Sequence, residues 1–230
     1  DPALLQRYAR GEVDVLPEPW TGLYPAGIFA GVEGKDVLCL AAGGGQQSAV
    51  FGVLGAHVTV VDLTEGQLAG DRKAAAHYGY PVTTIQSDMR DLSALEDGTF
   101  DLVYQANSIA YVPDLRTVYG EVSRILRAGG HYRVCAGQPA VHEMAWNGEA
   151  YCLTHPYADR VFHRPDGVGV EFRHTMDDLF NGLLDAGLTL ARVHEAPYAR
   201  LRRYRDEPAG TWNHEQSYVA GGFAIVAKKR

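Results

Sequence analysis

One stretch, residues 36–62, constrains the fold more than any other part of the sequence: DVLCLAAGGGQQSAVFGVLGAHVTVVD. Its parts, in order, are an apolar run (Val37 to Leu40), a loop of small residues (Ala41 to Gly45), a segment of helical length (Gln47 to Leu54), a second apolar run (Val58 to Val61) and a single acid, Asp62. This order of strand, glycine turn, helix, strand and acid is typical of the first β-α-β unit of a nucleotide-binding sheet.

The glycine turn and the acid together predict a ligand that contains a ribose. Small residues such as Gly43 and Gly45 let a ligand approach the backbone, and the helix that follows presents unpaired N–H groups. The carboxylate of Asp62, at the end of the second strand, can accept hydrogen bonds from two ribose hydroxyls. The alternative is a glycine turn that serves the chain alone and binds nothing.

The remaining apolar runs continue the alternation of strand and helix. Five more strands are predicted at residues 82–86, 100–104, 131–136, 189–195 and 222–228. Together with the opening unit they predict an α/β fold: a doubly wound, mostly parallel, seven-stranded sheet with helices on both faces.

Capping residues predict where the helices begin and end. Thr64 and Gln67 form one predicted capping box, and that helix stops at Gly79. Asp114 begins a helix that we expect to end at residues 129–130, which are both glycine. Thr175 and Asp178 form a second predicted capping box, for a helix that ends at Gly187.

Two segments fall outside the alternation, although we expect a single domain over residues 1–230. Residues 1–30 contain a helical candidate and a proline-rich part with Trp20 and Tyr24, which we interpret either as a lid over a pocket or as a plug at the sheet edge. Residues 137–174 form a long insertion after the fifth strand, with a predicted hairpin at 162–173. Between the last two strands we expect a polar loop.

Composition narrows the class of protein. With 21 basic and 28 acidic residues the formal charge is -7, which argues against a nucleic-acid-binding surface. Two of the three cysteines, Cys39 and Cys135, lie in apolar runs and are predicted to be buried free thiols, as in the reducing cytoplasm. We find no signal peptide and no apolar run of membrane-spanning length, and therefore expect a cytoplasmic protein without membrane contact. A homodimer and a monomer both remain open.

Polar residues follow the third and fourth predicted strands. Asp88 and Met89 come just after the third, and Asn107 and Tyr111 come after the fourth. Open α/β sheets bind ligands at this carboxyl edge. The carboxylate of Asp88 can accept from an exocyclic amine, and Met89 can pack on a ring. A helix N-cap is the alternative role for Asp88.

Four ordered motifs resemble the class I S-adenosylmethionine-dependent methyltransferases. They are VLCLAAGGGQQS, VTVVDLTEGQL, QSDMRDL, and FDLVYQANSIAYVPD with VSRILRAGGHYRV, and they cover residues 37–134 well. The resemblance implies a seven-stranded sheet whose last strand is antiparallel. The sequence departs from the family pattern at Cys39, which replaces a strand acid, at Ala41, which replaces the first glycine, and at Ala128, which replaces a proline.

The resemblance also implies roles for individual residues. The backbone of Ala41, Gly43 and Gly45 would border S-adenosylmethionine, Asp62 would hold its ribose, and Asn107 would lie near its methionine end. Leu63 and Met89 would flank the adenine, and Asp88 would accept from the adenine amine. Alanine at position 41 permits this approach if its φ angle is negative.

Methyl transfer requires an aligned acceptor in a dry, aromatic pocket, and a base where the acceptor is a hydroxyl. We predict a small-molecule acceptor, with its atom (O, N, S or C) left open. The candidate bases are His142 and Tyr111, each with a purely structural alternative. The candidate pocket residues are Trp20, Tyr24, Trp146 and Tyr151. Although the insertion is rich in histidine, no pair has the spacing of a zinc site, so no metal is expected.

Two other functions stay open at this level. An NAD(P)-dependent oxidoreductase shares the β-α-β unit and the ribose acid. Its fingerprint, however, needs Gly or Ala where this sequence has Ser48. A protein that binds S-adenosylmethionine without catalysis is the other alternative, because the first motif is altered.

Overall fold

A seven-stranded sheet forms the centre of the computed structural model, which describes residues 1–14, 16–17, 22–141, 144–163, 169–196 and 198–230. Its strands are β1 (Asp36–Leu40), β2 (His57–Asp62), β3 (Val82–Gln86), β4 (Phe100–Gln105), β5 (Leu126–Gly137), β10 (Leu188–Glu195) and β11 (Gly222–Lys229). They lie in the order β10-β11-β5-β4-β1-β2-β3. The strands from β3 to β5 pair in parallel, whereas β11 is antiparallel to both of its neighbours. The predicted sheet and its antiparallel last strand are therefore confirmed.

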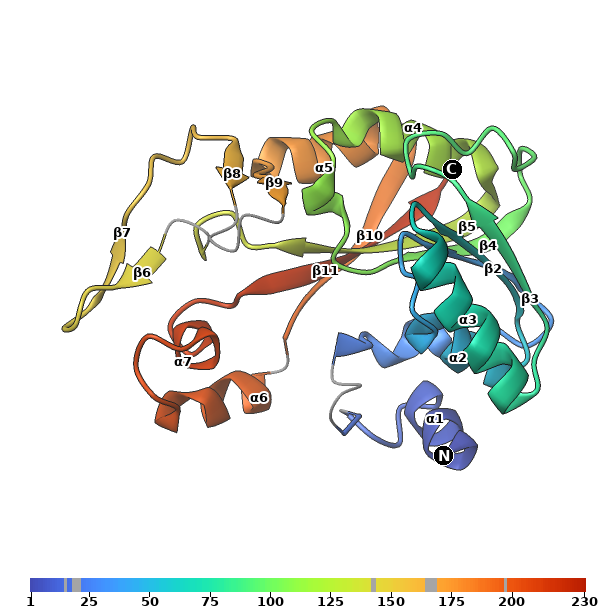
Figure 1. The fold of residues 1–230 in the computed structure, drawn as a ribbon, viewed down its shortest axis with the longest axis horizontal. Helices are drawn as coiled ribbons and strands as arrows, with labels where there is room; N and C mark the ends of the chain where they lie inside the picture. The colour runs from blue at the N-terminus through green and yellow to red at the C-terminus, as the bar shows by residue number, and fades with distance from the viewer. Residues whose placement is uncertain (15, 18–21, 142–143, 164–168, 197) are drawn as a thin grey trace.

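Helices cover both faces of this sheet (Figure 1). The helices are α1 (Pro2–Ala9), α2 (Gln46–Val53), α3 (Glu65–Tyr78), α4 (Leu115–Ile125), α5 (Met176–Asp185), α6 (Tyr198–Arg203) and α7 (Trp212–Gln216), with short 3-10 turns η2 (Ala26–Phe29), η3 (Ile109–Tyr111) and η5 (Tyr204–Asp206). Figure 1 shows α4 and α5 above the sheet and α1 to α3 on its other side. No described helix is long and apolar enough to cross a membrane.

The alternation of side chains along β1 explains how one short strand serves two cores. Leu38 and Leu40 belong to the core under α4 and α5. Val37 and Cys39 belong to the other core, which α1, α2 and η2 cover. Successive strand residues point to opposite faces, so a strand buried on both sides is apolar throughout. Cys39 is consequently inside the protein, with no exposed surface.

The two predicted capping boxes have different outcomes. At α5, the hydroxyl oxygen of Thr175 accepts from the backbone N–H of Asp178, whose carboxylate accepts from the N–H of Thr175, so this box is confirmed. At α3, Thr64 is the N-cap but its side chain makes no capping bond. Its hydroxyl donates instead to the carboxylate of Asp62, 3.1 Å away. That predicted box was wrong because the competing carboxylate lies two residues earlier.

Helix α4 is shorter than predicted. It ends at Ile125, and residues 126–130 already run along β4 as the irregular start of β5. The expected end at residues 129–130 was wrong because Leu126 turns away from the helix with an extended backbone and packs into the core. The two glycines lie instead within β5, at the shift of register beside Phe100 and Leu102.

The insertion after β5 forms two short hairpins beside the main sheet (Figure 1). They pair β6 (Met144–Trp146) with β7 (Tyr151–Leu153), and β8 (Val161–His163) with β9 (Val170–Phe172). The second pairing confirms the predicted hairpin, and the first was not predicted. The loop expected between the last two strands was wrong, because α6, η5 and α7 occupy that part of the chain.

Candidate active site

The glycine loop after β1 is held by two carboxylates of the protein itself. The N–H of Gly43 donates to Asp62 Oδ2 at 3.1 Å. The N–H groups of Gly44 and Gly45 donate to the two oxygens of Asp71 at 2.9 and 3.0 Å. Internal acceptors therefore already bind these three N–H groups of the turn. The unpaired N–H groups expected of the helix that follows, α2, stay a prediction.

Asp71 supports the glycine loop and was missed by sequence reasoning. It lies on α3 with no exposed surface, and Ser48 donates a hydrogen bond to it. Burial raises the pKa of Asp71, although the hydrogen bonds from Ser48, Gly44 and Gly45 oppose that shift. The signal was an acid in line with Leu68 and Ala75 on the buried stripe of a helix, where an unpaired carboxylate is costly.

Close packing on α3 explains why this loop needs glycines. A Cβ atom at Gly43 would lie 2.6 Å from Gln67 Cβ, and one at Gly45 would lie 2.8 Å from Ala74 Cβ. Gly45 also has a φ of 84°, which favours glycine. The glycines therefore allow the loop to approach a helix of the same chain, in addition to any approach of a ligand.

Ala41 and Cys39 mark the altered part of the motif. Ala41 has a φ of 44°, so the condition of a negative angle is not met, and a left-handed alanine is strained. Burial raises the pKa of the Cys39 thiol, with a smaller contribution from the nearby Asp71 carboxylate. Cys39 is thus a neutral core side chain that replaces the family's acid without offering a charge.

The end of β2 presents a half-buried carboxylate beside an exposed apolar side chain. Asp62 is half-buried, and its two oxygens accept from the N–H groups of Gly43 and Thr64. The hydroxyl of Thr64 also donates to it, so of the roughly four acceptor positions of a carboxylate about one is left unfilled by the described residues. The next side chain, Leu63, is 63% exposed and presents an apolar surface beside that carboxylate.

The loop after β3 is arranged around Asp88. Its carboxylate accepts from Arg90 through the backbone N–H, Nε and Nη2, at 2.8, 3.0 and 2.6 Å. The side-chain hydrogen bond from Arg90 lowers the pKa of Asp88. The bond to the N–H of Arg90 closes a turn rather than a helix, so the N-cap alternative was wrong. Met89 is half-buried, and its sulfur accepts from Gln105 at 3.2 Å.

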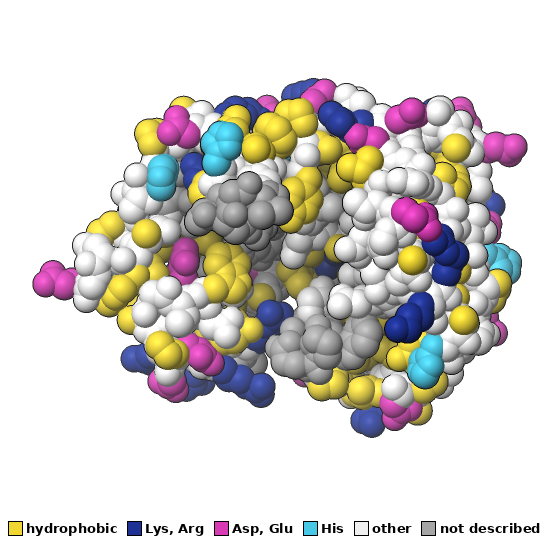
Figure 2. All heavy atoms as spheres, in the orientation of Figure 1, with side chains coloured by type: hydrophobic (Ala, Val, Ile, Leu, Met, Phe, Trp, Pro, Cys, Tyr) yellow, Lys and Arg dark blue, Asp and Glu magenta, His cyan; other side chains and the backbone are white. Residues whose placement is uncertain are grey.

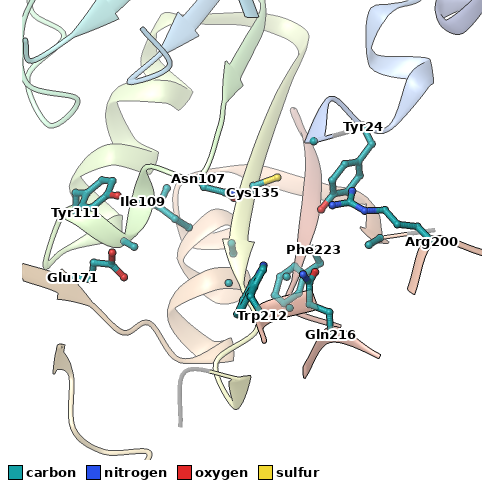
Figure 3. A pocket seen from close by; sticks show the side chains of 17 residues that line it. Tyr24, Asn107, Ile109, Tyr111, Cys135, Glu171, Arg200, Trp212, Gln216 and Phe223 are labelled. Atoms are coloured by element: carbon teal, nitrogen blue, oxygen red, sulfur yellow. The ribbon is translucent and has the colours of Figure 1, made fainter. Parts of the chain in front are cut away.

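A cavity of about 330 Å³, here called the Asn107 cavity, opens at the carboxyl ends of β4 and β5. Figure 2 shows the molecule hollowed in the middle of this face, between the side with α2 and α3 and the side with β6–β9, α6 and α7. The cavity is lined by Gly22, Tyr24, Asn107, Ile109, Ala110, Tyr111, Cys135, Ala136, Gly137, Glu171, Ala196, Arg200, Trp212, Gln216, Gly221, Gly222 and Phe223. In Figure 3, Tyr111 and Glu171 lie on one side, Tyr24 and Arg200 on the other, and Asn107 and Cys135 between them.

This cavity brings together three of the predicted site residues. Tyr24, Asn107 and Tyr111 line it, and Tyr111 is 52% exposed. The other predicted cofactor residues (Ala41, Gly43, Gly45, Asp62, Leu63, Asp88 and Met89) are not among its lining residues. Two further predicted residues, Trp20 and His142, lie outside the described part of the chain.

Trp146 and Tyr151 form a separate aromatic cluster with α7. The hydroxyl of Tyr151 lies 2.7 Å from Nδ1 of His214, and the rings of Trp146 and Tyr151 are 5.1 Å apart. Neither side chain lines the Asn107 cavity. Trp212, Gln216 and Phe223, which sequence reasoning did not select, line it instead.

A buried arginine attaches the segment that carries Tyr24 to the sheet. Arg133 on β5 is 1% exposed and donates to the backbone carbonyl of Tyr24 at 2.7 and 2.9 Å. It also donates to the carbonyl of Gln105 at 3.0 Å and lies 4.4 Å from the ring centre of Tyr104. Within the described residues no carboxylate pairs with it, so carbonyl dipoles and aromatic faces stabilise its charge.

The structure thus combines a doubly wound α/β sheet with a cavity at the carboxyl edge of its strands. Among the described residues, no group of three His, Cys, Asp or Glu side chains is arranged to hold a metal ion. Residues 38–134 match the model of a family described as a methyltransferase domain.

Individual relatives agree with this match. The chain is 31% identical over 206 residues to the uncharacterized methyltransferase YbaJ of Bacillus subtilis, covering 84% of this chain and 80% of the relative. It is 31% identical over 144 residues to a ubiquinone biosynthesis O-methyltransferase of Azotobacter vinelandii, covering 59% of this chain and 61% of the relative. An S-adenosylmethionine-dependent methyltransferase of Mesorhizobium loti, 21% identical, has the same fold, with a TM-score of 0.72 over 99% of this chain and 96% of that chain.

The chain belongs to the class I S-adenosylmethionine-dependent methyltransferase family. It is therefore an enzyme that uses S-adenosylmethionine, and the NAD(P)-dependent oxidoreductase and the non-catalytic binding protein are set aside. The alterations at Cys39 and Ala41 are variations within that family.

Proposed function

We propose that this enzyme methylates a small organic acceptor bound in the Asn107 cavity. The position of Asn107 supports this most directly. In the register of the sheet, Leu40 of β1 lies opposite Gln105 of β4. The glycine loop and Asn107 therefore leave neighbouring strands at the same edge, and Asn107 also lines the cavity. The methionine end of the cofactor and the acceptor would then meet beside Asn107.

The dimensions of the cavity support a small molecule. Ligand pockets for small molecules measure about 300–1,000 Å³, and this cavity of about 330 Å³ lies at the lower end of that range. The formal charge of -7 gives no support to a nucleic-acid substrate. The relative named for ubiquinone biosynthesis is described as an O-methyltransferase, which is consistent with a small-molecule acceptor here.

The chain's own residues would contribute positioning and exclusion of water. Bound S-adenosylmethionine supplies an electrophilic methyl group on a positively charged sulfur. Asp62 would hold the ribose through its remaining acceptor position, and Leu63 would cover the adenine. Aromatic side chains from separate elements, Tyr24, Trp212 and Phe223, would hold the acceptor in line with the methyl group. Their rings would also place apolar surface beside the sulfur, whose positive charge disperses during transfer.

The two irregular segments would complete the acceptor site. Residues 1–30 contribute Tyr24 to the cavity wall, as expected of a lid, and Arg133 holds that segment in place. The insertion at 137–174 contributes Glu171 from β9. We assign Trp146 and Tyr151 a supporting role, because they join the first hairpin to α7 through His214. Trp20 and His142 stay predictions from the sequence, and Tyr111 stays a candidate partner of the acceptor.

The proposal is tested by measuring transfer from methyl-labelled S-adenosylmethionine to a panel of small hydroxyl, amine, thiol and activated-carbon acceptors. We expect label in at least one acceptor. Asn107→Ala should lower kcat/KM by about tenfold or more, which corresponds to a loss of about 1.4 kcal/mol in transition-state stabilisation. The exposed variant Asp185→Ala, at the last residue of α5 and outside the lining of the cavity, is the control and should leave kcat/KM unchanged. Full activity of Asn107→Ala would contradict the placement of the reaction beside this residue.

A further inference from the structure

His174 has one ring nitrogen bound and the other without a partner. It lies between β9 and α5 and is 8% exposed. Its Nε2 is 3.1 Å from the backbone carbonyl oxygen of Ile109 in η3. Its Nδ1 is buried and has no hydrogen-bond partner in the part of the chain that the structure describes. A buried polar atom without a partner is rare enough to require an explanation.

The bond to Ile109 fixes which nitrogen of the ring carries the proton. A carbonyl oxygen can only accept, so Nε2 must carry the hydrogen and donate it. In a neutral imidazole the other nitrogen, Nδ1, then presents a lone pair. Nδ1 is therefore a basic atom held in a fixed direction, as in catalytic histidines whose second nitrogen is anchored.

The surroundings of the ring keep it neutral. Burial lowers the pKa of His174 below its ordinary value of 6.5, and the positive charge of Arg160 acts in the same direction. The carbonyls of Ile109 and Val112 and the carboxylate of Asp178 on α5 oppose that shift, but burial outweighs them. At neutral pH the Nδ1 lone pair is consequently available to accept a proton.

A small cavity beside His174, here called the neck, adjoins the Asn107 cavity. It measures about 30 Å³, and His174, Pro139 and Phe172 are among its lining residues. It shares four lining residues with the Asn107 cavity: Ile109, Ala110, Ala136 and Gly137. Because a water needs about 10–15 Å³ of such space, this neck accommodates a hydroxyl group or one to two waters.

We propose that Nδ1 of His174 accepts the proton of the methyl acceptor, either directly or through one water in the neck, and that the acceptor atom is a hydroxyl oxygen. This inference rests on the proposed function and extends it to a substrate class. The acceptor oxygen forms a bond to the methyl carbon while the carbon–sulfur bond breaks and its electron pair stays on sulfur. The hydroxyl proton moves to Nδ1, and the resulting imidazolium later releases it to solvent.

A hydroxyl acceptor explains why a base lies at this position. An alcohol or phenol is un-ionised at neutral pH and attacks well only as its proton leaves. A thiol ionises much more readily, and a buried neutral imidazole would contribute little to its methylation. His174 also lies in a described and buried part of the insertion, unlike the exposed rim position of Tyr111.

His174→Gln tests the proton transfer, because a glutamine amide can still donate to Ile109 but has no basic nitrogen. With catechol as the hydroxyl probe we expect kcat to fall by about 100-fold or more, and with benzenethiol by no more than about threefold. Wild-type kcat/KM for catechol should fall as the pH drops through the lowered pKa of His174, and the variant should not show this decrease. The matched control is His155→Gln, an exposed histidine of the same insertion, which should keep both activities.

A measurement without turnover tests the geometry. Nitrogen NMR of the imidazole in the complex with S-adenosylhomocysteine should show hydrogen on Nε2 and a pKa below 6.5 for His174. Hydrogen on Nδ1, equal losses on both probes, or transfer to benzenethiol but never to catechol would each overturn the inference. In the last case the proposed function stands, since S-adenosylhomocysteine still binds and methyl transfer still occurs. Absence of S-adenosylhomocysteine binding in calorimetry would instead overturn the proposed function itself.

Discussion

At the scale of single residues, Asp62 and Asp71 both bind the glycine loop but differ in their exposure to solvent. Asp71 is fully buried and binds the N–H groups of Gly44 and Gly45, so its role is internal. Asp62 is only half-buried and keeps an acceptor position that no described residue fills. The sequence predicted Asp62 because an acid ends an apolar strand. It did not predict Asp71, because a single acid in a helix is ordinarily a solvated surface residue.

Replacing Asp71 with alanine should destabilise the protein strongly. The variant leaves the N–H groups of Gly44 and Gly45 and the hydroxyl of Ser48 without their acceptor. A buried donor without a partner costs about 1–3 kcal/mol, so a loss of about 2 kcal/mol or more in the free energy of unfolding is expected. Urea denaturation measures it. Wild-type stability in Asp71→Ala would mean that the loop does not depend on this carboxylate.

Replacing Ala41 with glycine should stabilise the protein. The left-handed φ of 44° costs an alanine about 1–2 kcal/mol, and glycine adopts it freely. The greater freedom of glycine in the unfolded chain offsets about 0.4–1 kcal/mol of that gain. A net rise of about 0.5–1 kcal/mol in unfolding free energy is expected. Ala42→Gly, at a neighbouring residue without positive φ, should lower stability and serves as the control.

At the scale of elements, the N-terminal segment depends on Arg133 for its attachment. The guanidinium of this β5 residue binds the carbonyl of Tyr24 and reaches that of Gly22 at 3.5 Å. Both of these residues line the Asn107 cavity. These hydrogen bonds add to the packing of Leu23 and Phe29 in the core and fix the segment at the wall of the Asn107 cavity.

Arg133→Met should release this segment without removing the sheet beneath it. Methionine fills a similar volume but donates nothing to the carbonyls of Tyr24 and Gln105. Hydrogen exchange should become faster in η2 and the residues around Tyr24, and kcat/KM for the acceptor should fall by about tenfold or more. Affinity for S-adenosylhomocysteine should change less. Unchanged exchange in this segment would show that another contact holds it.

The beginnings and ends of helices could be predicted where capping signals in the local sequence agreed with the tertiary contacts. The capping box at Thr175 and the stop at Gly79 are local, and both were correct. The end of α4 was not predictable, because the irregular pairing of residues 126–130 with β4 overrides the two glycines. Similarly, α6 and α7 lie in a polar stretch of the sequence. His214 and Gln216 of α7 are nevertheless buried, and the contact of His214 with Tyr151 of the distant insertion could not be predicted from that stretch.

At the scale of the whole molecule, the seven-stranded sheet could be predicted from the sequence, whereas the set of side chains that line the Asn107 cavity could not. All seven strands were predicted from apolar runs separated by helices, and the antiparallel last strand was implied by the family resemblance, whereas the order of the strands was not predicted. The Asn107 cavity, in contrast, combines residues from the N-terminal segment, β4, β5, β9, α7 and β11. No spacing in the sequence brings Trp212 or Phe223 beside Tyr24, so these side chains could be selected only from the fold.

The stability of the whole molecule should decrease as the pH falls from 7.5 to 5.5. Burial lowers the pKa values of His131, His174 and His194. The unfolded chain therefore binds protons at a higher pH than the folded one. The stabilisation that these three histidines contribute is present above about pH 6.5. It is lost as the pH falls through their lowered pKa values in the folded protein. Thermal unfolding across this range measures the effect, and a constant or rising Tm on acidification would contradict it.

The most direct test of the central claim is calorimetric titration of S-adenosylhomocysteine into the wild-type protein and into Asp62→Ala. The account predicts binding to the wild type and at least about tenfold weaker binding to the variant, a difference of about 1.4 kcal/mol. Asp62→Asn, which preserves the shape of the side chain and one acceptor oxygen, should lie between them. Equal affinity in all three proteins would contradict the assignment of Asp62 to the ribose, and with it the placement of the cofactor along the glycine loop.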